Sequence, residues 1–163
     1  MKETPSQKLD PRVKNVWRIN DFLWITLTAL CVIVPVRLIA LDPAAAAACS
    51  LLTTATCLFY GAALILWLLV LPPIRYMRWR YEVSEQYLDI AKGIIWRKRY
   101  VIPFIRVQNT DTRQGPLLRA FKLKSVTVAT AAEEHVIPGL SDSVADDLRE
   151  RAAELARLAR EDV

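Results

Sequence analysis

The residue types that carry most enzyme chemistry are sparse in this sequence of 163 residues. Its single histidine, His135, lies between Glu134 and Val136 in a predicted short strand, a setting typical of a structural or solvent-facing histidine. The adjacent carboxylates Asp146 and Asp147 fall in a predicted helix, where neighbouring residues do not face each other. The sequence also has no glycine-rich phosphate loop. It therefore predicts a protein that is not an enzyme, with no catalytic residue and no cofactor.

The three cysteines do not form a metal-binding pattern. Cys31, Cys49 and Cys57 all lie in or beside the apolar half of the chain, and their spacing matches no common zinc signature. We interpret them as small apolar side chains of helices. The sequence therefore predicts no metal site.

Three arginines directly follow the second long apolar stretch of the chain. They are Arg75, Arg78 and Arg80. A basic residue close to an anionic leaflet contributes on the order of 1 kcal/mol of attraction, so these three are candidate contacts for lipid headgroups. The simpler interpretation is a topological signal that keeps this end of the stretch in the cytoplasm.

A second basic cluster lies in the segment WRKRY (96–100), which predicts part of a strand. On a strand, Arg97 and Arg99 share one face while Lys98 points to the other, so only part of the cluster converges. Arg97 and Arg99 are further candidate headgroup contacts, and the alternative is a solvated basic face. The net charge is +5 and the pI is near 9.3. Because much of the excess positive charge lies beside the apolar stretches, we predict no nucleic-acid partner.

Two apolar stretches predict a pair of transmembrane helices. The first covers residues 22–41, and a helix of that length spans roughly 30 Å, the thickness of a hydrocarbon core. The second covers about 44–71 and includes Gly61, Ala62 and Ala63, a small-residue patch suited to close helix packing. Lysine and arginine are concentrated outside the outer ends of the pair. The positive-inside rule therefore predicts a multi-pass protein with both termini in the cytoplasm.

Beyond the second apolar stretch, apolar and polar residues begin to alternate. Short runs rich in β-branched and aromatic residues recur at close intervals, which predicts antiparallel strands in a barrel or sandwich. Ile94, Ile95 and Trp96 are interpreted as part of a half-buried strand. Residues 141–160 predict a helix whose apolar stripe must cover other elements, and the nearest candidate is the open mouth of the preceding barrel. The stripe consists of Val144, Leu148, Ala152, Leu155 and Ala159.

These patterns divide the chain into three parts. Residues 1–21 form a cytoplasmic N-terminal segment, residues 22–71 a transmembrane helical hairpin, and residues 72–163 a cytoplasmic domain.

The order of short motifs resembles one family of membrane proteins. After the two apolar stretches come a strand pair, then IPFIRVQ (102–108), QGPLLR (114–119) and IPGLSD (137–142), and LDPRVKNVWRI (9–19) resembles the family's N-terminal lead. Together these motifs resemble the bacterial PH-domain (pleckstrin-homology-like) family of YdbS-like membrane proteins. One departure is FKLKS (121–125), where the family often has a glycine. The resemblance implies an α+β membrane protein, in which a PH-like antiparallel β-barrel or sandwich is capped by a C-terminal helix.

The resemblance also implies a cellular role. We expect a membrane-anchored interaction or scaffold protein of the bacterial cytoplasmic (inner) membrane, since members of the family are linked to envelope protection. Its expected partners are the lipid bilayer and either a second copy or another PH-domain membrane protein. Two alternatives stay open: an anionic-lipid-sensing module that uses the basic residues, and an accessory subunit of a transport assembly.

Overall fold

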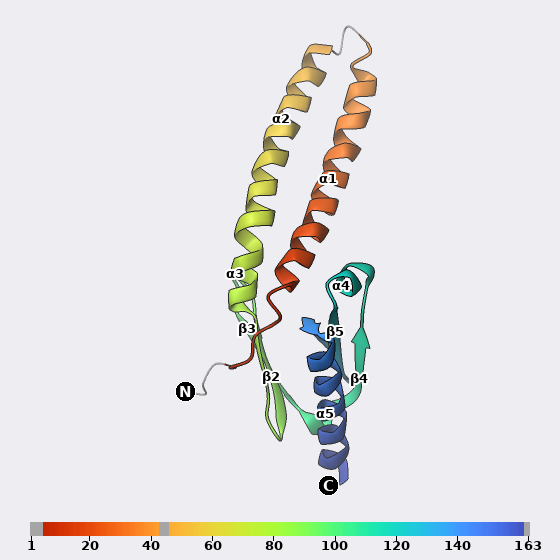
Figure 1. The fold of residues 1–163 in the computed structure, drawn as a ribbon. Helices are drawn as coiled ribbons and strands as arrows, with labels where there is room; N and C mark the ends of the chain where they lie inside the picture. Colours follow the sequence, from red (N-terminus) through yellow and green to blue (C-terminus); the bar gives the residue numbers. More distant parts are fainter. Residues whose placement is uncertain (1–4, 43–45, 162–163) are drawn as a thin grey trace. The chain divides into compact units, whose positions relative to one another are not determined.

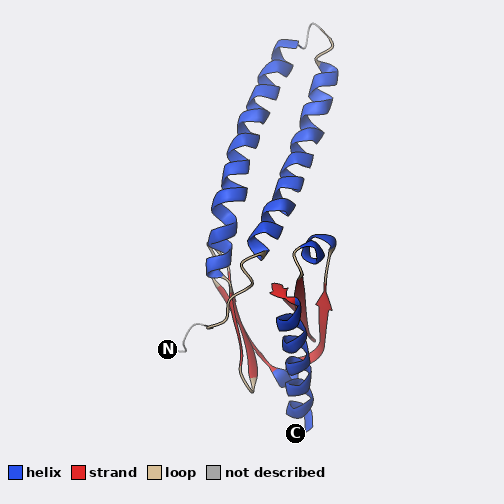
Figure 2. Ribbon diagram, viewed as in Figure 1, coloured by secondary structure: helices blue, strands red, loops and turns tan. Residues whose placement is uncertain are grey.

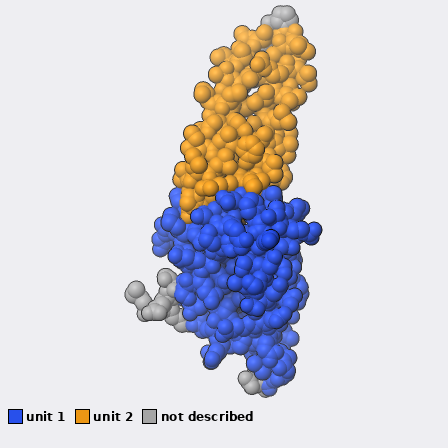
Figure 3. Space-filling model, in the orientation of Figure 1, with its two compact units in different colours: residues 1–16, 74–163 blue, residues 17–73 orange. Residues whose placement is uncertain are grey.

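The structure is a computed structural model that describes residues 5–42 and 46–161 (Figure 1). Two compact units share the chain (Figure 3). One, the helical unit, contains residues 17–73, and the other, the β-rich unit, joins residues 1–16 to residues 74–163. The β-rich unit is therefore assembled from two separate pieces of sequence, whereas the sequence patterns treated residues 1–21 as a segment apart.

The helical unit contains most of two long apolar helical rods that lie side by side (Figures 1 and 2), and the outer ends of the rods belong to the β-rich unit. The first rod is helix α1 (Val13–Ile39). The second is continuous through α2 (Ala46–Leu64), a π-helical stretch η1 (Ile65–Val70) and α3 (Leu71–Arg78). Both rods are long and apolar enough to cross a membrane, as predicted. The start predicted for the second helix, residue 44, lies outside the described residues.

Helix α1 begins well before residue 22, where the apolar run starts. The cause is a local start signal, Asp10-Pro11. The Asp10 side chain accepts a hydrogen bond from the Arg12 amide at 2.9 Å, and the Asp10 carbonyl accepts one from the Val13 amide at 3.1 Å. An aspartate cap followed by proline in the first turn is a strong helix-initiating pair. The helix therefore starts within polar sequence and continues into the apolar run.

One residue, Leu71, separates the π-helical stretch from two prolines, Pro72 and Pro73. Pro72 has no amide hydrogen, so the Leu68 carbonyl cannot receive its usual helical hydrogen bond. The side chain of Arg18 on α1 donates to that carbonyl instead, with Nε 2.9 Å from the oxygen. A second link between the rods joins the hydroxyls of Thr26 and Tyr60 at 3.1 Å. The two rods are thus held together by polar contacts as well as by packing.

The β-rich unit contains two three-stranded antiparallel sheets, in the orders β1-β2-β3 and β4-β5-β6. The first comprises β1 (Arg80–Val83), β2 (Tyr87–Lys92) and β3 (Lys98–Pro103). A 3-10 turn, η2 (Phe104–Arg106), leads to the second, which comprises β4 (Val107–Arg113), β5 (Leu123–Thr130) and β6 (Glu134–Ser141). The short helix α4 (Pro116–Ala120) connects β4 to β5. Because no ladder joins the two sheets within the described residues, the domain consists of two open sheets and is not a closed barrel.

Helix α5 (Asp142–Glu161) packs against β4, β5 and η2, which confirms the predicted C-terminal cap. Its buried face is Ala145, Leu148, Ala152 and Ala156. The predicted stripe was partly wrong, since Val144 is 42% exposed. The core beneath the helix is apolar and includes Phe104, Val126, Val128, Ile137 and Leu140.

The segment before β3 differs from its prediction. Residues 94–96 are not strand, because β2 ends at Lys92 and β3 begins only at Lys98. Ile95 and Trp96 are therefore 84% and 81% exposed and not half-buried.

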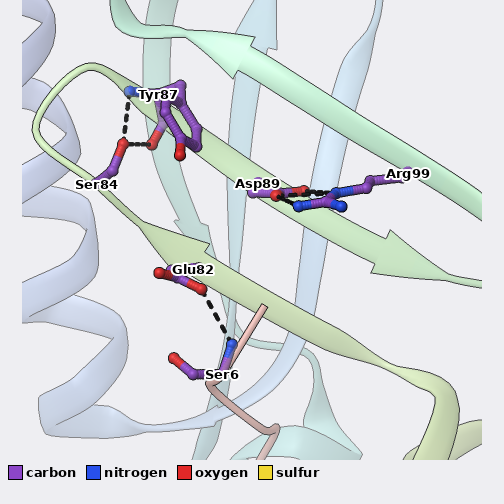
Figure 4. A network of polar contacts seen from close by, with 6 residues as sticks. All are labelled: Ser6, Glu82, Ser84, Tyr87, Asp89 and Arg99. Atoms are coloured by element: carbon purple, nitrogen blue, oxygen red, sulfur yellow. Dashed lines mark hydrogen bonds and ion pairs between the residues drawn. The ribbon is translucent and has the colours of Figure 1, made fainter. Parts of the chain in front are cut away.

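The N-terminal residues extend the first sheet. Gln7 and Tyr81 exchange two backbone hydrogen bonds of 3.0 Å, which places Gln7 along the outer edge of β1. The Ser6 amide donates to the Glu82 carboxylate at 3.1 Å (Figure 4). Leu9 and Val13 are almost fully buried. We call residues 5–13 the N-terminal strap.

The strap is fastened at a glycine of β6. The Asp10 amide donates to the Gly139 carbonyl at 3.0 Å. Gly139 has a φ of +64°, and a side chain there would overlap the Val13 side chain. Only glycine meets both demands, because it tolerates positive φ and leaves room for the close approach.

Candidate basic cleft

Most of the predicted headgroup contacts line one cleft in the β-rich unit. The cleft has a volume of about 370 Å³ and lies between the end of α3 and the turn that joins β2 to β3. Its lining residues are Met77, Arg78, Arg80, Ala91, Lys92, Gly93, Arg97, Lys98 and Arg99. Six of these nine residues are basic and none is acidic, so the cleft suits an anionic ligand. We call it the basic cleft.

The turn between β2 and β3 depends on Gly93. This residue has a φ of +116°, and a side chain there would collide with the Trp96 carbonyl oxygen. The turn sets Lys92 opposite Lys98 at the end of the ladder. One row further along the sheet, Ala91 pairs with Arg99 on one side and with Arg80 on the other. Neighbouring strands lie about 5 Å apart, so this register gathers basic residues that are distant in sequence.

Arg99 is held in an ion pair with Asp89 (Figure 4). Its Nη2 and Nε lie 2.5 and 3.0 Å from Asp89 Oδ2, and Nε is also 3.0 Å from Oδ1. The Asp89 side chain is 5% exposed. Hydrogen bonding to Asp89 raises the pKa of Arg99 above its already high ordinary value. Arg99 therefore contributes to the wall of the cleft, while most of its charge is balanced by Asp89.

Arg80 and Lys92 have partners that leave their positive charge uncompensated. Arg80 Nη1 donates to the Trp79 carbonyl at 2.7 Å and to the Tyr76 carbonyl at 3.4 Å, and so caps the last turn of α3. The Lys92 ammonium lies 5.0 Å from the centre of the Tyr100 ring. Both groups still present a cation to an anionic ligand.

The remaining cations of the cleft are the ones best placed for a ligand. Arg78, Arg97 and Lys98 are exposed, and their side chains make no hydrogen bond or ion pair within the part of the chain that the structure describes. Arg75, by contrast, is exposed on α3 but does not line the cleft.

The structure thus brings together four of the five predicted arginines. It adds Lys92, which the sequence analysis missed, and Lys98, which the sequence analysis wrongly excluded from the cluster because it expected the side chain on the opposite face of the strand. In the structure Lys92 and Lys98 flank the turn 93–97 and pair with each other, a register that the sequence alone did not indicate.

The predicted small-residue patch on α2 is less uniform than its sequence. Ala63 is buried, Ala62 is exposed and Gly61 is half-buried. A side chain at Gly61 would meet nothing within 4 Å. In this patch, close packing therefore falls at Ala63.

A second concave feature lies along β3, on the side away from β2. This groove has a volume of about 980 Å³ and is bordered by β3, the start of β4 and the turn between β5 and β6. Val101 and Ile105 line it and are 44% and 47% exposed. His135 also lines it, with its ring 4.9 Å from that of Tyr100. We call this feature the β3 groove.

His135 is the only histidine of the chain, and it is 5% exposed. Burial lowers its pKa below the ordinary value, against a smaller opposing effect of the Glu133 carboxylate. Its Nε2 lies 3.6 Å from Glu133 Oε1. No group of three His, Cys, Asp or Glu side chains that could hold a metal ion occurs among the residues described.

Comparison with known proteins identifies the family. The model of the bacterial PH domain matches residues 21–156. The UPF0699 transmembrane protein YdbS of Bacillus subtilis (strain 168) is 35% identical over the full length of both chains. The chain belongs to the bacterial PH-domain family. A second relative, the UPF0699 transmembrane protein YdbT of the same organism, is 28% identical over 56% of this chain and 20% of its own length. No solved structure matches.

Membership confirms the resemblance seen in the motifs. This bacterial PH-domain protein is a membrane protein, since its full-length relative is a transmembrane protein and two of its helices are long and apolar enough to span a bilayer. The PH-like domain is made of the two sheets and α5. The matched region begins at residue 21, so the strap lies outside it.

Proposed function

We propose that this bacterial PH-domain protein is a non-enzymatic interaction module of the bacterial cytoplasmic membrane. Its helical hairpin anchors it, both termini lie in the cytoplasm, and the domain assembles with a second copy or with another PH-domain membrane protein in envelope protection. The observation that carries this proposal is the β3 groove, which runs beside a strand that pairs only with β2 in the described chain.

An open strand edge favours assembly for a physical reason. The unpaired edge of a strand offers amide and carbonyl groups that an added strand can satisfy, and flanking apolar side chains select what is added. Here Val101 on β3 and Ile105 on η2 supply exposed apolar surface beside that edge. Arg106 and Arg160 border the same groove.

Assembly is tested with two differently tagged copies of the full chain. We expect the copies to co-purify from co-expressing cells after mild detergent extraction, and Val101→Asp in both copies to abolish this. Val136→Asp is the matched control, because Val136 is 38% exposed on β6 and does not line the groove. Equal co-purification of the Val101 and Val136 variants would refute assembly through the groove.

Orientation is tested separately. The concentration of lysine and arginine at the outer ends of the two apolar stretches supports cytoplasmic termini, by the positive-inside rule. A phosphatase reporter that requires export, fused after Val163, should be inactive, and a fluorescent reporter that folds only in the cytoplasm should be bright. The opposite pair of results would overturn the proposed topology.

A second candidate function is recognition of anionic lipid, and the basic cleft is the observation that favours it. The side chains of Arg78, Arg97 and Lys98 are available to a ligand in the cleft, and no lining residue is acidic. Native mass spectrometry of the full chain, released from phosphatidylglycerol bilayers, should show fewer retained lipids for the double variant R97E/K98E. The control variant R119E/K122E changes two exposed basic residues at α4 by the same charge. Equal losses in both would mean that only net charge matters.

A further inference from the structure

The turn between β2 and β3 exposes two large apolar side chains at its outermost point. We call residues 93–97 the hairpin tip. Ile95 is 84% and Trp96 is 81% exposed, and these are the two most exposed large apolar side chains of the described β-rich unit. Met77, on the last turn of α3, is also 59% exposed, and it lines the basic cleft together with Gly93 and Arg97 of the tip. An exposed aliphatic–aromatic pair marks a contact surface, because leaving it in water costs free energy.

Basic residues surround this apolar pair. Lys92 and Lys98 face each other at the base of the tip, and Arg97 follows Trp96 directly. No acidic residue lies between Lys92 and Lys98. A tryptophan with an apolar body and a polar N–H, next to lysine and arginine, has the composition of segments that settle at a membrane interface.

The hairpin tip lies next to the end of the second helical rod. Arg80 follows the last residue of α3 by two positions and pairs with Ala91, which precedes Gly93 by two positions. Met77 and Arg78 of α3 line one cleft together with Gly93 and Arg97 of the tip. The tip therefore lies at nearly the same depth in the bilayer as the end of α3, whatever that depth is.

The length and the composition of the rod together indicate that depth. The apolar rod Ala46–Arg78 has 33 residues, or about 50 Å of helix at 1.5 Å per residue, against a hydrocarbon core of about 30 Å. Its apolar sequence ends near Leu71 and its basic residues begin at Arg75. This composition favours a position of the end of α3 in the headgroup layer, and the tip would then lie there with it.

We infer that the hairpin tip enters the interface of the bilayer in which the protein is anchored. Ile95 and Trp96 reach below the phosphates, while Lys92, Arg97 and Lys98 bind them. The tip thus provides a third attachment of the protein to the membrane, which restricts the orientation of the PH-like domain. This inference deepens the lipid recognition proposed for the basic cleft and rests on it only for the contribution of the cations.

Site-directed labelling of the full chain in bilayers tests the inference. Cys31, Cys49 and Cys57 are first replaced by alanine, and one new cysteine is introduced by Ile95→Cys or, in the control, Val136→Cys. Both sites are exposed, so labelling does not disturb the core. We expect a fluorophore at position 95 to be quenched severalfold more by nitroxide-labelled lipid than one at position 136, and severalfold less by iodide. Equal quenching at positions 95 and 136 would overturn the inference. A label introduced by Trp96→Cys repeats the measurement at the neighbouring residue, and equal quenching at positions 96 and 136 would overturn the inference as well.

The charge-reversed cleft separates this inference from lipid recognition. In bilayers of pure phosphatidylcholine and of phosphatidylcholine with phosphatidylglycerol, the label at position 95 is measured with and without R97E/K98E. We expect lipid nitroxides to quench the label more strongly when phosphatidylglycerol is present, and R97E/K98E should remove that difference.

If the label stays deep in both bilayers despite R97E/K98E, the tip inserts and anionic recognition by the cleft fails. If the label stays in water while lipid retention still depends on Arg97 and Lys98, insertion fails and recognition by the cleft stands. Shielding of position 95 from iodide without quenching by lipid would instead indicate a protein partner and overturn insertion.

Discussion

Two tryptophans and two arginines show how a residue's neighbours decide its role. Trp79 follows the arginine-rich end of the second rod and yet is 4% exposed, in the core, whereas Trp96, in a strand-like run, is 81% exposed. Arg97 and Arg99 share a motif, but Arg99 faces the buried carboxylate of Asp89 and Arg97 does not. Local sequence identifies such residues as apolar or basic, while the register of β2 and β3 decides which are buried or paired.

The Asp89–Arg99 pair leads to a prediction for stability. Asp89 is almost fully buried while the Arg99 side chain is 36% exposed, so removing the arginine leaves a carboxylate with little access to water. We expect Arg99→Met to lower the free energy of unfolding by about 2–3 kcal/mol, because a broken buried pair strands a charge. Asp89→Asn added to it should cost less than the sum of the two single changes. The measurement is denaturant unfolding of the full chain in micelles, followed by circular dichroism in the β region.

Arg97→Met is the matched control for this cycle, since Arg97 lies two positions away and is exposed. Its effect should stay within about 0.5 kcal/mol. If Arg97→Met lowered the free energy of unfolding as much as Arg99→Met, the loss would come from removing positive charge near the turn and not from breaking the Asp89–Arg99 pair.

The lowered pKa of His135 leads to a prediction of how stability changes with pH. Burial lowers its pKa below 6.5 in the folded protein, with Glu133 opposing and Lys92 reinforcing the shift. Between the lowered value and 6.5 the unfolded chain binds the proton and the folded chain does not, so stability falls as the pH drops through this window. We expect the unfolding free energy to be fully retained above pH 6.5 and to decrease below it. His135→Gln should flatten this part of the curve, and parallel curves for the two proteins would contradict the assignment.

At the scale of elements, the two rods owe their ends to residues outside the apolar runs. Asp10 starts α1, and Pro72 removes a hydrogen bond from the second rod that Arg18 restores. Hydropathy locates the spans because twenty apolar residues match the bilayer. It does not report caps or side-chain bridges, since these depend on one or two polar residues in a defined geometry.

Arg18 is therefore expected to stabilise the hairpin. We expect Arg18→Met to lower the stability of the helical hairpin by about 1–2 kcal/mol, because the Leu68 carbonyl loses its donor in apolar surroundings. Reversible unfolding of the full chain in mixed micelles by added SDS measures this. Arg37→Met, the same change near the other end of α1, is the control and should have a smaller effect. Equal effects would indicate that the contact with Leu68 contributes nothing.

The order of the elements in the β-rich unit was largely predictable from sequence, and the assembly of the unit was not. Alternation and turn residues indicate strands because side chains on a sheet repeat every two residues. The same pattern does not distinguish a closed barrel from two open sheets, since both bury one face of each strand. The basic cleft was foreseen in its arginines but not in its lysines, because convergence depends on register across strands and the end of α3.

At the scale of the whole molecule, the PH-like domain is completed by residues that precede the membrane spans. The strap adds Gln7 to the edge of β1 and buries Leu9 and Val13, and its Asp10 binds Gly139 on β6. The two rods separate the strap from the rest of the β-rich unit in sequence, so the strap packs on the domain only if both ends of the helical hairpin lie on the same side of the membrane. This arrangement couples the fold of the domain to correct insertion of the anchor.

A comparison of two soluble chains tests this coupling. One contains residues 74–163 alone, and the other carries residues 5–16 joined ahead of them by a flexible glycine-serine linker. Fully burying one large aliphatic side chain contributes about 1.5–3 kcal/mol, so we expect the joined chain to be more stable by about 3 kcal/mol or more in urea unfolding. Replacing Leu9 and Val13 by serine in the joined chain should cancel the gain, because the strap would then bury little apolar surface. If residues 74–163 alone were as stable as the joined chain, the strap would contribute nothing to the stability of the domain, and the domain would fold without it.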